Sequence, residues 1–63
     1  MQKFLVSLSW RDTVGWNLLT KVFDAPNATR ATETAMQYVW ATEPYCFGLR
    51  VLSVHLGAKQ DAK

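Results

Sequence analysis

The sequence predicts a small α+β domain, in which a three-stranded sheet carries one helix packed across one face. Two observations support this fold class. Apolar residues recur at intervals of three and four between positions 27 and 41, and they alternate with polar residues in the flanking segments. The predicted order is strand, strand, helix, strand (β-β-α-β). A chain of 63 residues has room for one such domain, which we assign to residues 1–57.

The first two strands are predicted to form a hairpin. Residues 2–10 alternate, so that one face collects four apolar side chains, Phe4, Val6, Leu8 and Trp10. The polar segment 11–15 ends in Gly15, which can adopt the positive φ that hairpin loops often require. The next strand, residues 16–23, has apolar side chains on both faces: Trp16, Leu18, Thr20 and Val22 share one, and Asn17, Leu19, Lys21 and Phe23 share the other.

The helix is expected to begin near residue 27. Asn27 follows Pro26 and can accept hydrogen bonds from the first free backbone N–H groups as an N-cap. Pro44 ends the pattern, because the residue before a proline is pushed out of the helical region. The apolar face is narrow, so the helix can approach the sheet closely while the strands supply the bulk: Ala28, Ala31, Thr32, Ala35, Met36 and Val39.

Residues 47–56 are rich in branched side chains and predict the third strand. The apolar residues change parity along this strand, which indicates a β-bulge or burial on both sides near Gly48: Leu49 and Val51 are odd, whereas Leu52, Val54 and Leu56 are even.

The favoured topology pairs the first two strands antiparallel and places the third strand beside the first. A third strand parallel to the second, joined by a right-handed helical crossover, is also allowed, as is an arrangement with the first strand central. The sheet face without the helix would be open, and an exposed apolar and basic face is a candidate docking surface. We expect this face to carry Lys3, Leu5, Leu19, Lys21 and Phe23.

Composition narrows the class of protein. A hydrophobic share of 49% is too high for a disordered chain, and we expect disorder only in the tail, residues 58–63. No run is long enough to span a membrane and no signal-peptide pattern is present, so we expect a cytoplasmic protein without a membrane partner. Seven Lys and Arg against five Asp and Glu give a net charge of +2, a weak basic balance that argues only faintly for nucleic acid.

The sequence contains no recognisable catalytic or metal-binding set. His55 is the single histidine and the acidic residues are dispersed, so neither a metal site nor an acid–base pair can be assembled. Cys46, the single cysteine, excludes an internal disulfide; we interpret it as a small apolar residue, with a reactive thiol as the alternative. We therefore predict a protein that is not an enzyme and binds no cofactor or metal.

Aromatic residues give the strongest indication of a binding function. Two tryptophans bracket the hairpin loop and further aromatic residues cluster at the helix end, with arginines nearby in the sequence. Core and lid residues of a small domain would show the same pattern, but tryptophan, tyrosine and arginine are also the types that interface centres prefer. The candidate partner-binding residues are Arg50, Arg11, Trp10, Trp16, Trp40 and Tyr45.

Four short matches carry a resemblance to a known family: Lys3-Phe4 in the first strand, Met36-Gln37-Tyr38-Val39 at the helix end, Phe47, and Arg50-Val51-Leu52. With the element order, they resemble the small phage-encoded inhibitors of bacterial RNA polymerase from T-odd coliphages. The resemblance implies that Arg50 contacts the jaw of the polymerase's largest subunit. The chain differs from that family in having Leu52 at the place of a second arginine, a longer loop after the helix, and a basic balance.

The functional hypothesis is a phage host-takeover protein that binds and inhibits a bacterial enzyme, with host RNA polymerase as the first candidate. An inhibitor of a bacterial defence nuclease would use the same surface physics. A nucleic-acid-binding accessory protein is a further alternative, and so is a homodimer in which a second copy buries the open sheet face.

Overall fold

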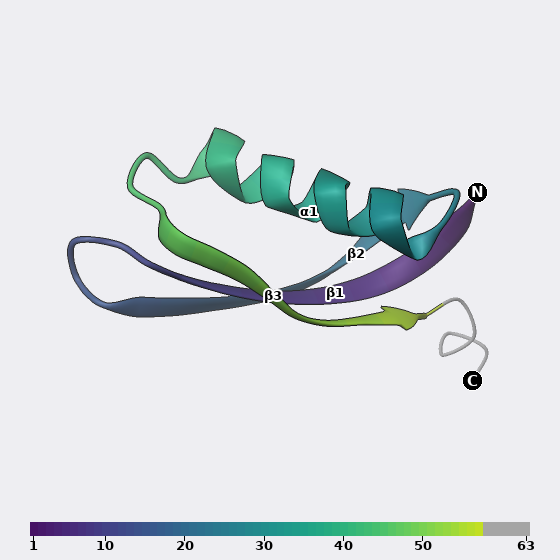
Figure 1. The fold of residues 1–63 in the computed structure, drawn as a ribbon, viewed down its shortest axis with the longest axis horizontal. Helices are drawn as coiled ribbons and strands as arrows, with labels where there is room; N and C mark the ends of the chain where they lie inside the picture. Colours follow the sequence, from purple (N-terminus) through teal and green to yellow (C-terminus); the bar gives the residue numbers. More distant parts are fainter. Residues whose placement is uncertain (58–63) are drawn as a thin grey trace.

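The computed structural model describes residues 1–57 and confirms the α+β fold class. Its elements follow in the predicted order, β1 (Gln2–Arg11), β2 (Trp16–Ala25), α1 (Ala28–Thr42) and β3 (Phe47–Leu56), and the helix lies across one side of the sheet (Figure 1). Each boundary lies within two residues of its prediction. The tail predicted as disordered, 58–63, lies outside the described residues.

The sheet has the order β2-β1-β3, and β1 pairs antiparallel with both of its neighbours. The third strand therefore lies beside the first, as the favoured topology predicted. The central position of β1 explains why its alternation is the clearest in the chain. Its four apolar side chains on one face are all buried: Phe4, Val6, Leu8 and Trp10.

The hairpin loop is fixed by Asp12. Its Oδ1 accepts hydrogen bonds from the backbone N–H groups of Val14 (2.8 Å) and Gly15 (2.9 Å), and its Oδ2 accepts one from the Asn17 amide (2.8 Å). The Asp12 N–H donates to the Gly15 carbonyl oxygen at 2.9 Å. An aspartate that bonds the backbone two or three residues ahead is a common turn device, and here it closes a loop of residues 12–15.

The loop sets a register in which Arg11 lies opposite Trp16, with ten consecutive pairs and no shift. Residues directly opposite each other share a face, so the buried Phe4 side of β1 continues into Phe23, and not into Val22. The prediction that Leu19, Lys21 and Phe23 lie on the open face is therefore wrong, whereas Lys3 and Leu5 do lie there. Apolar residues on both faces of β2 left its orientation open, and only the register decides it.

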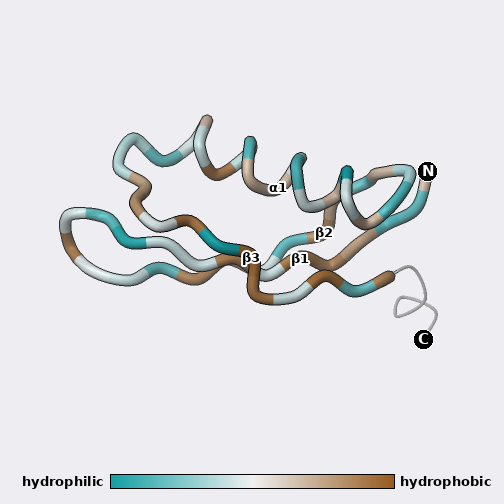
Figure 2. The backbone as a smooth tube through the Cα atoms, in the orientation of Figure 1, coloured by the Kyte–Doolittle hydropathy of each residue, from teal (hydrophilic) through white to brown (hydrophobic). Residues whose placement is uncertain are grey.

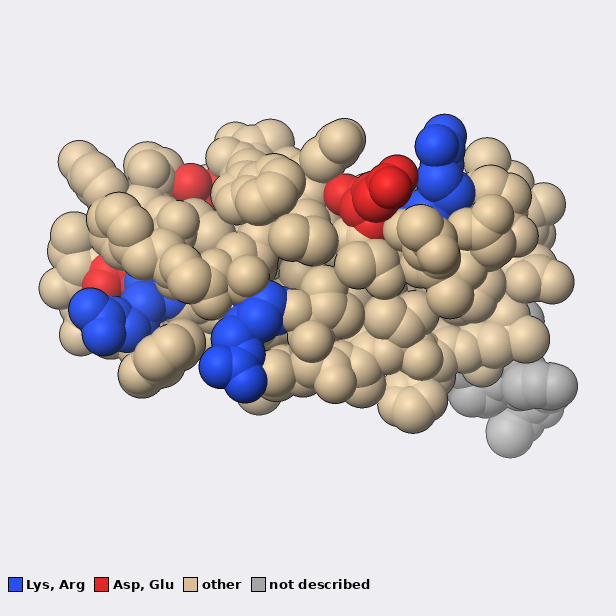
Figure 3. Space-filling model, viewed as in Figure 1, with Lys and Arg blue, Asp and Glu red and all other residues tan. Residues whose placement is uncertain are grey.

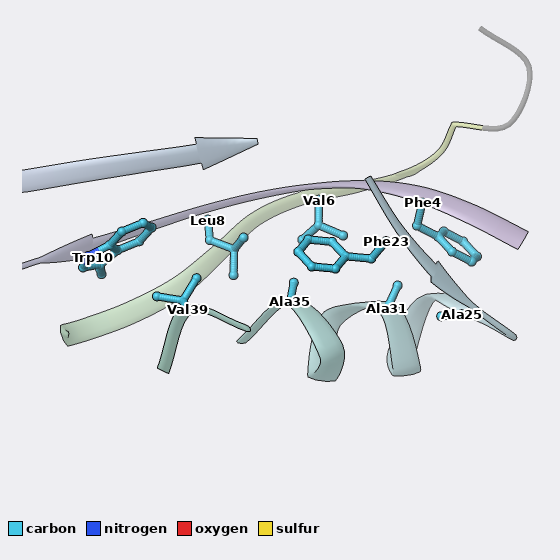
Figure 4. Close-up of a cluster of buried hydrophobic side chains, with 9 residues drawn as sticks. All are labelled: Phe4, Val6, Leu8, Trp10, Phe23, Ala25, Ala31, Ala35 and Val39. Carbon is cyan, nitrogen blue, oxygen red and sulfur yellow. The ribbon is translucent and has the colours of Figure 1, made fainter. Parts of the chain in front are cut away.

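Asn27 caps the start of the helix as predicted, and its Oδ1 accepts a hydrogen bond from the Arg30 N–H at 2.9 Å. Ala31, Ala35 and Val39 recur every four residues and are completely buried against the strands. Figure 4 shows these short side chains facing the larger ones of β1 and β2 across the layer. The helix is thus close to the sheet because its contact face has little bulk.

The bulge predicted near Gly48 is present, and the φ of 63° at this residue suits glycine. A second bulge lies at Leu52, which has no direct partner because the register with β1 shifts between Ser7 and Leu8. The bulge at Leu52 reverses the parity of the strand. It thereby keeps both Val54, opposite Val6, and Val51, opposite Leu8, on the helix side of the sheet.

The two layers differ in length and in hydropathy. A helix of 15 residues is about 22 Å long, whereas ten-residue strands reach about 33 Å, so the strands extend beyond it. The strands carry most of the strongly hydrophobic positions, while α1 alternates (Figure 2). Within residues 1–57, no element covers the opposite sheet face, and no helix has the length and apolar character needed to cross a membrane.

Candidate partner-binding surface

The open face is the sheet surface opposite α1. It carries the odd-numbered side chains of β1 and the residues that lie opposite them on β2 and β3. Several of its apolar side chains are well exposed, with 65% exposure for Trp16, 69% for Leu18 and 54% for Phe47. An exposed apolar group of this kind on one face is typical of an interaction surface.

Aromatic and basic side chains meet at the hairpin end of the open face. The Arg11 guanidinium lies 5.9 Å from the centre of the Trp16 ring, within the range of a cation–π interaction. Phe47 lies opposite Arg11 on the other neighbouring strand, and Arg50 lies opposite Ser9, in the next row. Trp16, Arg11 and Phe47 thus form one row across all three strands, which we call the aromatic row.

The charges on the open face are unevenly paired. At the end away from the hairpin, Lys3 forms an ion pair with Asp24 at 3.0 Å. On the helix, Arg30 lies 3.9 Å from Glu33. Among residues 1–57, neither Arg11 nor Arg50 lies within ion-pair distance of a carboxylate. Figure 3 shows the Lys and Arg side chains of the visible side as separate groups and not as a dense basic face.

The structure brings together three of the six candidate residues and separates the others. Arg11, Trp16 and Arg50 all lie on the open face towards the hairpin. Trp10 faces the helix and is only 5% exposed, so it is a core residue, and its indole Nε1 has no hydrogen-bond partner within the described chain. Trp40 and Tyr45 are exposed, but they lie on α1 and in the loop after it.

Sequence reasoning missed Leu18, Val22 and Phe47 as members of the open face. The length of the hairpin loop could have found Leu18 and Val22, which lie on β2, but not Phe47, which lies on β3. A loop of four residues, 12–15, places Trp16 opposite Arg11 and hence all even residues of β2 on the solvent side of β1. Periodicity alone identified the two sets of β2 residues but could not say which set faces the helix.

The remaining reactive side chains do not assemble into a site. Cys46 is half-buried against the core, and burial, with a smaller effect from the nearby Glu43 charge, raises the pKa of its thiol. A raised pKa favours the neutral thiol, in agreement with a small apolar role. His55 is exposed on the open face opposite Leu5. Across residues 1–57 there is no pocket and no group of three potential metal ligands.

Comparisons with known proteins give no relative: no protein-family model matches the chain, and no curated protein or solved structure matches it significantly. The fold therefore defines the class as a small α+β protein, in which residues 1–57 place one helix across one face of the sheet.

Proposed function

We propose that this chain is a binding protein, not an enzyme, that attaches to a bacterial protein through the open face and blocks it sterically. The observation that carries the proposal is the aromatic row with Arg50 beside it, where exposed apolar surface and two unpaired guanidinium groups coincide. A host-takeover protein acting in the bacterial cytoplasm would work in this way, because occupying a functional surface requires no chemistry of its own.

The composition of the open face supports a protein partner. Interface centres are enriched in aromatic residues and arginine, and their apolar area is covered by apolar side chains of the partner. Leu18 and Val22 are aliphatic and exposed, so they need cover of this kind. A free arginine can bind a carboxylate of the partner through two parallel hydrogen bonds.

The first candidate target is bacterial RNA polymerase. The resemblance to phage inhibitors assigns the polymerase contact to Arg50, and the exposed position of Arg50 beside the aromatic row supports that assignment. A defence nuclease remains the alternative target, since it would be held by the same surface.

The test is direct binding of the purified protein to bacterial RNA polymerase, followed by a transcription assay. We expect Arg50→Ala to weaken binding by about tenfold or more, the scale of an interface hot spot. Arg30→Ala is the matched control, because Arg30 is also an exposed arginine but lies on the helix, and its removal should leave binding unchanged. Equal affinity for both variants would overturn the role of Arg50, and no binding to the polymerase would discard this target.

A single-stranded nucleic acid is a second candidate ligand, and the aromatic row favours it. Trp16 and Phe47 are exposed on either side of Arg11 on one sheet surface, where bases could stack. Such binding should weaken steeply with salt through counterion release, whereas a largely apolar protein interface should tolerate moderate salt. Fluorescence titration of the tryptophans with an oligonucleotide at two salt concentrations separates the two candidates.

A further inference from the structure

The outer edge of β2 has a defined hydrogen-bonding pattern. In an antiparallel pair of strands, two kinds of opposite residues alternate. One kind exchanges backbone hydrogen bonds across the pair, and the other directs its N–H and C=O groups away from the pair. The Asp12 N–H bonds the Gly15 carbonyl oxygen, so the next pair, Arg11 and Trp16, is of the outward kind. The hydrogen bond from the Gly57 N–H to the Lys3 carbonyl oxygen agrees with this assignment, because it shows that an odd-numbered residue of β1 directs its carbonyl group away from β2.

Five residues of β2 therefore direct their backbone N–H and C=O groups away from β1, towards the outer edge of the sheet: Trp16, Leu18, Thr20, Val22 and Asp24. In residues 1–57 no strand pairs with this edge, because β2 is the end of the order β2-β1-β3. The edge therefore presents a row of donors and acceptors as long as the strand itself.

The edge of β2 carries one device that opposes strand addition, the charged Lys21 on the helix side, but lacks the others. Natural edge strands carry bulges, prolines or charges that point inward. β2 has ten consecutive pairs without a shift and contains no proline or glycine, whereas β3, the other edge, is interrupted twice. The two charged residues of β2 are both engaged within the chain, since Lys21 lies 5.5 Å from the Tyr38 ring centre and Asp24 pairs with Lys3.

We propose that a second copy of the chain adds to this edge, with the two β2 strands antiparallel about a two-fold axis at Thr20. In this register every outward residue has a partner, and two three-stranded sheets become one six-stranded sheet. A shift of the axis by two residues to Leu18 or Val22 would leave outward residues at one end of each strand without partners.

The side chains are compatible with the Thr20 register. On the open face, Leu18 lies opposite Val22 of the partner subunit, and Trp16 lies opposite Asp24 of the partner subunit. On the helix side, Leu19 lies opposite Lys21 of the partner subunit. No two like charges are directly opposed, and the central pair, Thr20 with Thr20 of the partner subunit, is a favourable β-sheet pair.

The dimer has a geometric consequence. A two-fold axis perpendicular to a continuous sheet keeps both helices on one side, so the two open faces join on the other. The proposal does not depend on the identity of any target, since it rests on the β2 edge and concerns only two copies of this chain.

The test is the mass of the full chain by sedimentation equilibrium from micromolar to millimolar concentration. We expect a concentration-dependent dimer, which Thr20→Pro reduces to a monomer. The Thr20 N–H is not bonded to β1, so proline at this edge position should leave the fold intact. Thr20→Val is the matched control: like proline it removes the hydroxyl that bonds the Ser7 hydroxyl at 2.9 Å, but it keeps the N–H and should still dimerise.

Hydrogen exchange of the unmodified chain provides a measurement that needs no variant. Exchange at the amides of Trp16, Leu18, Thr20, Val22 and Asp24 should slow as concentration rises, while the odd-numbered amides of β2 stay protected throughout. A monomer over the whole range would overturn the proposal. A dimer that Thr20→Pro leaves intact, or one that protects no even-numbered β2 amide, would overturn it too, because another surface would then form the contact.

Discussion

At the scale of single residues, Asp12 fixes the hairpin loop through the three hydrogen bonds that its carboxylate accepts. The hydrogen bonds from the Gly15 N–H, the Asn17 amide and the Val14 N–H hold its pKa below the ordinary value. All three hydrogen bonds favour the ionised carboxylate, so the stability of the loop depends on the charge of Asp12. The register of the hairpin, and with it the identity of the open face, depends on this loop.

This link between loop and charge predicts a pH dependence of the free energy of unfolding. Because the folded pKa of Asp12 is lowered, its stabilising contribution is fully present above about pH 4 and is lost as the pH falls through the folded pKa. Asp12→Asn should keep one acceptor oxygen for the Val14 and Gly15 N–H groups, lose the acceptor for the Asn17 amide, and lose this part of the acid dependence. Urea unfolding of both proteins from pH 7 to pH 2 checks it, and parallel pH profiles for the two would contradict the prediction.

At the scale of elements, α1 packs against the sheet through small side chains. Ala31, Ala35 and Val39 are completely buried, so no space remains between the helix axis and the strands for a larger side chain. The bulk of the core comes from β1 and Phe23.

This packing predicts that Ala35→Leu destabilises the protein by about 1–3 kcal/mol, the usual cost of overpacking a filled core. Thr34→Leu is the matched control, because Thr34 is exposed on the same turn and should change the stability by less than about 0.5 kcal/mol. Chemical denaturation measures both variants. An Ala35→Leu protein as stable as the unmodified one would show that the two layers can separate without cost.

Local sequence signals predicted the elements well, and non-local pairing accounts for what they missed. The Asn27 cap, the break before Pro44 and the alternation of β1 are local features, and the structure confirms them. The second strand continues to Ala25 because Gln2, far away in the sequence, lies opposite it. Likewise, the orientation of β2 depends on a register that no property of β2 alone specifies.

At the scale of the whole molecule, residues 1–57 form a single helix layer on a sheet, and within this range the helix covers one side of the sheet. Residue type predicted only part of the candidate site. Arg11, Trp16 and Arg50 are residue types that favour interfaces, and they lie on the open face. Trp10 is of the same type but lies in the core. Residue type indicates what a side chain can contribute, whereas the face it occupies follows from the assembled sheet.

One-sided packing predicts that stability and binding respond to different leucines. Leu18 is largely exposed, so Leu18→Ser should change the free energy of unfolding by less than about 0.5 kcal/mol while weakening attachment to a protein target. Leu8 is completely buried, and Leu8→Ala should cost about 2–5 kcal/mol. Thermal unfolding and a binding assay on the same samples separate the effects; a strongly destabilised Leu18→Ser would mean that the open face is covered in the folded protein.

The bond between Gly57 and Lys3 also fixes where the chain enters and leaves the described fold. Both points lie at the end of the sheet opposite the loop of residues 12–15 (Figure 1). A tether joined to residue 1 would therefore hold the molecule by the far end of its long axis, which extends 38 Å. An immobilised molecule would project Arg11, Arg50 and Trp16 into solution, away from the support.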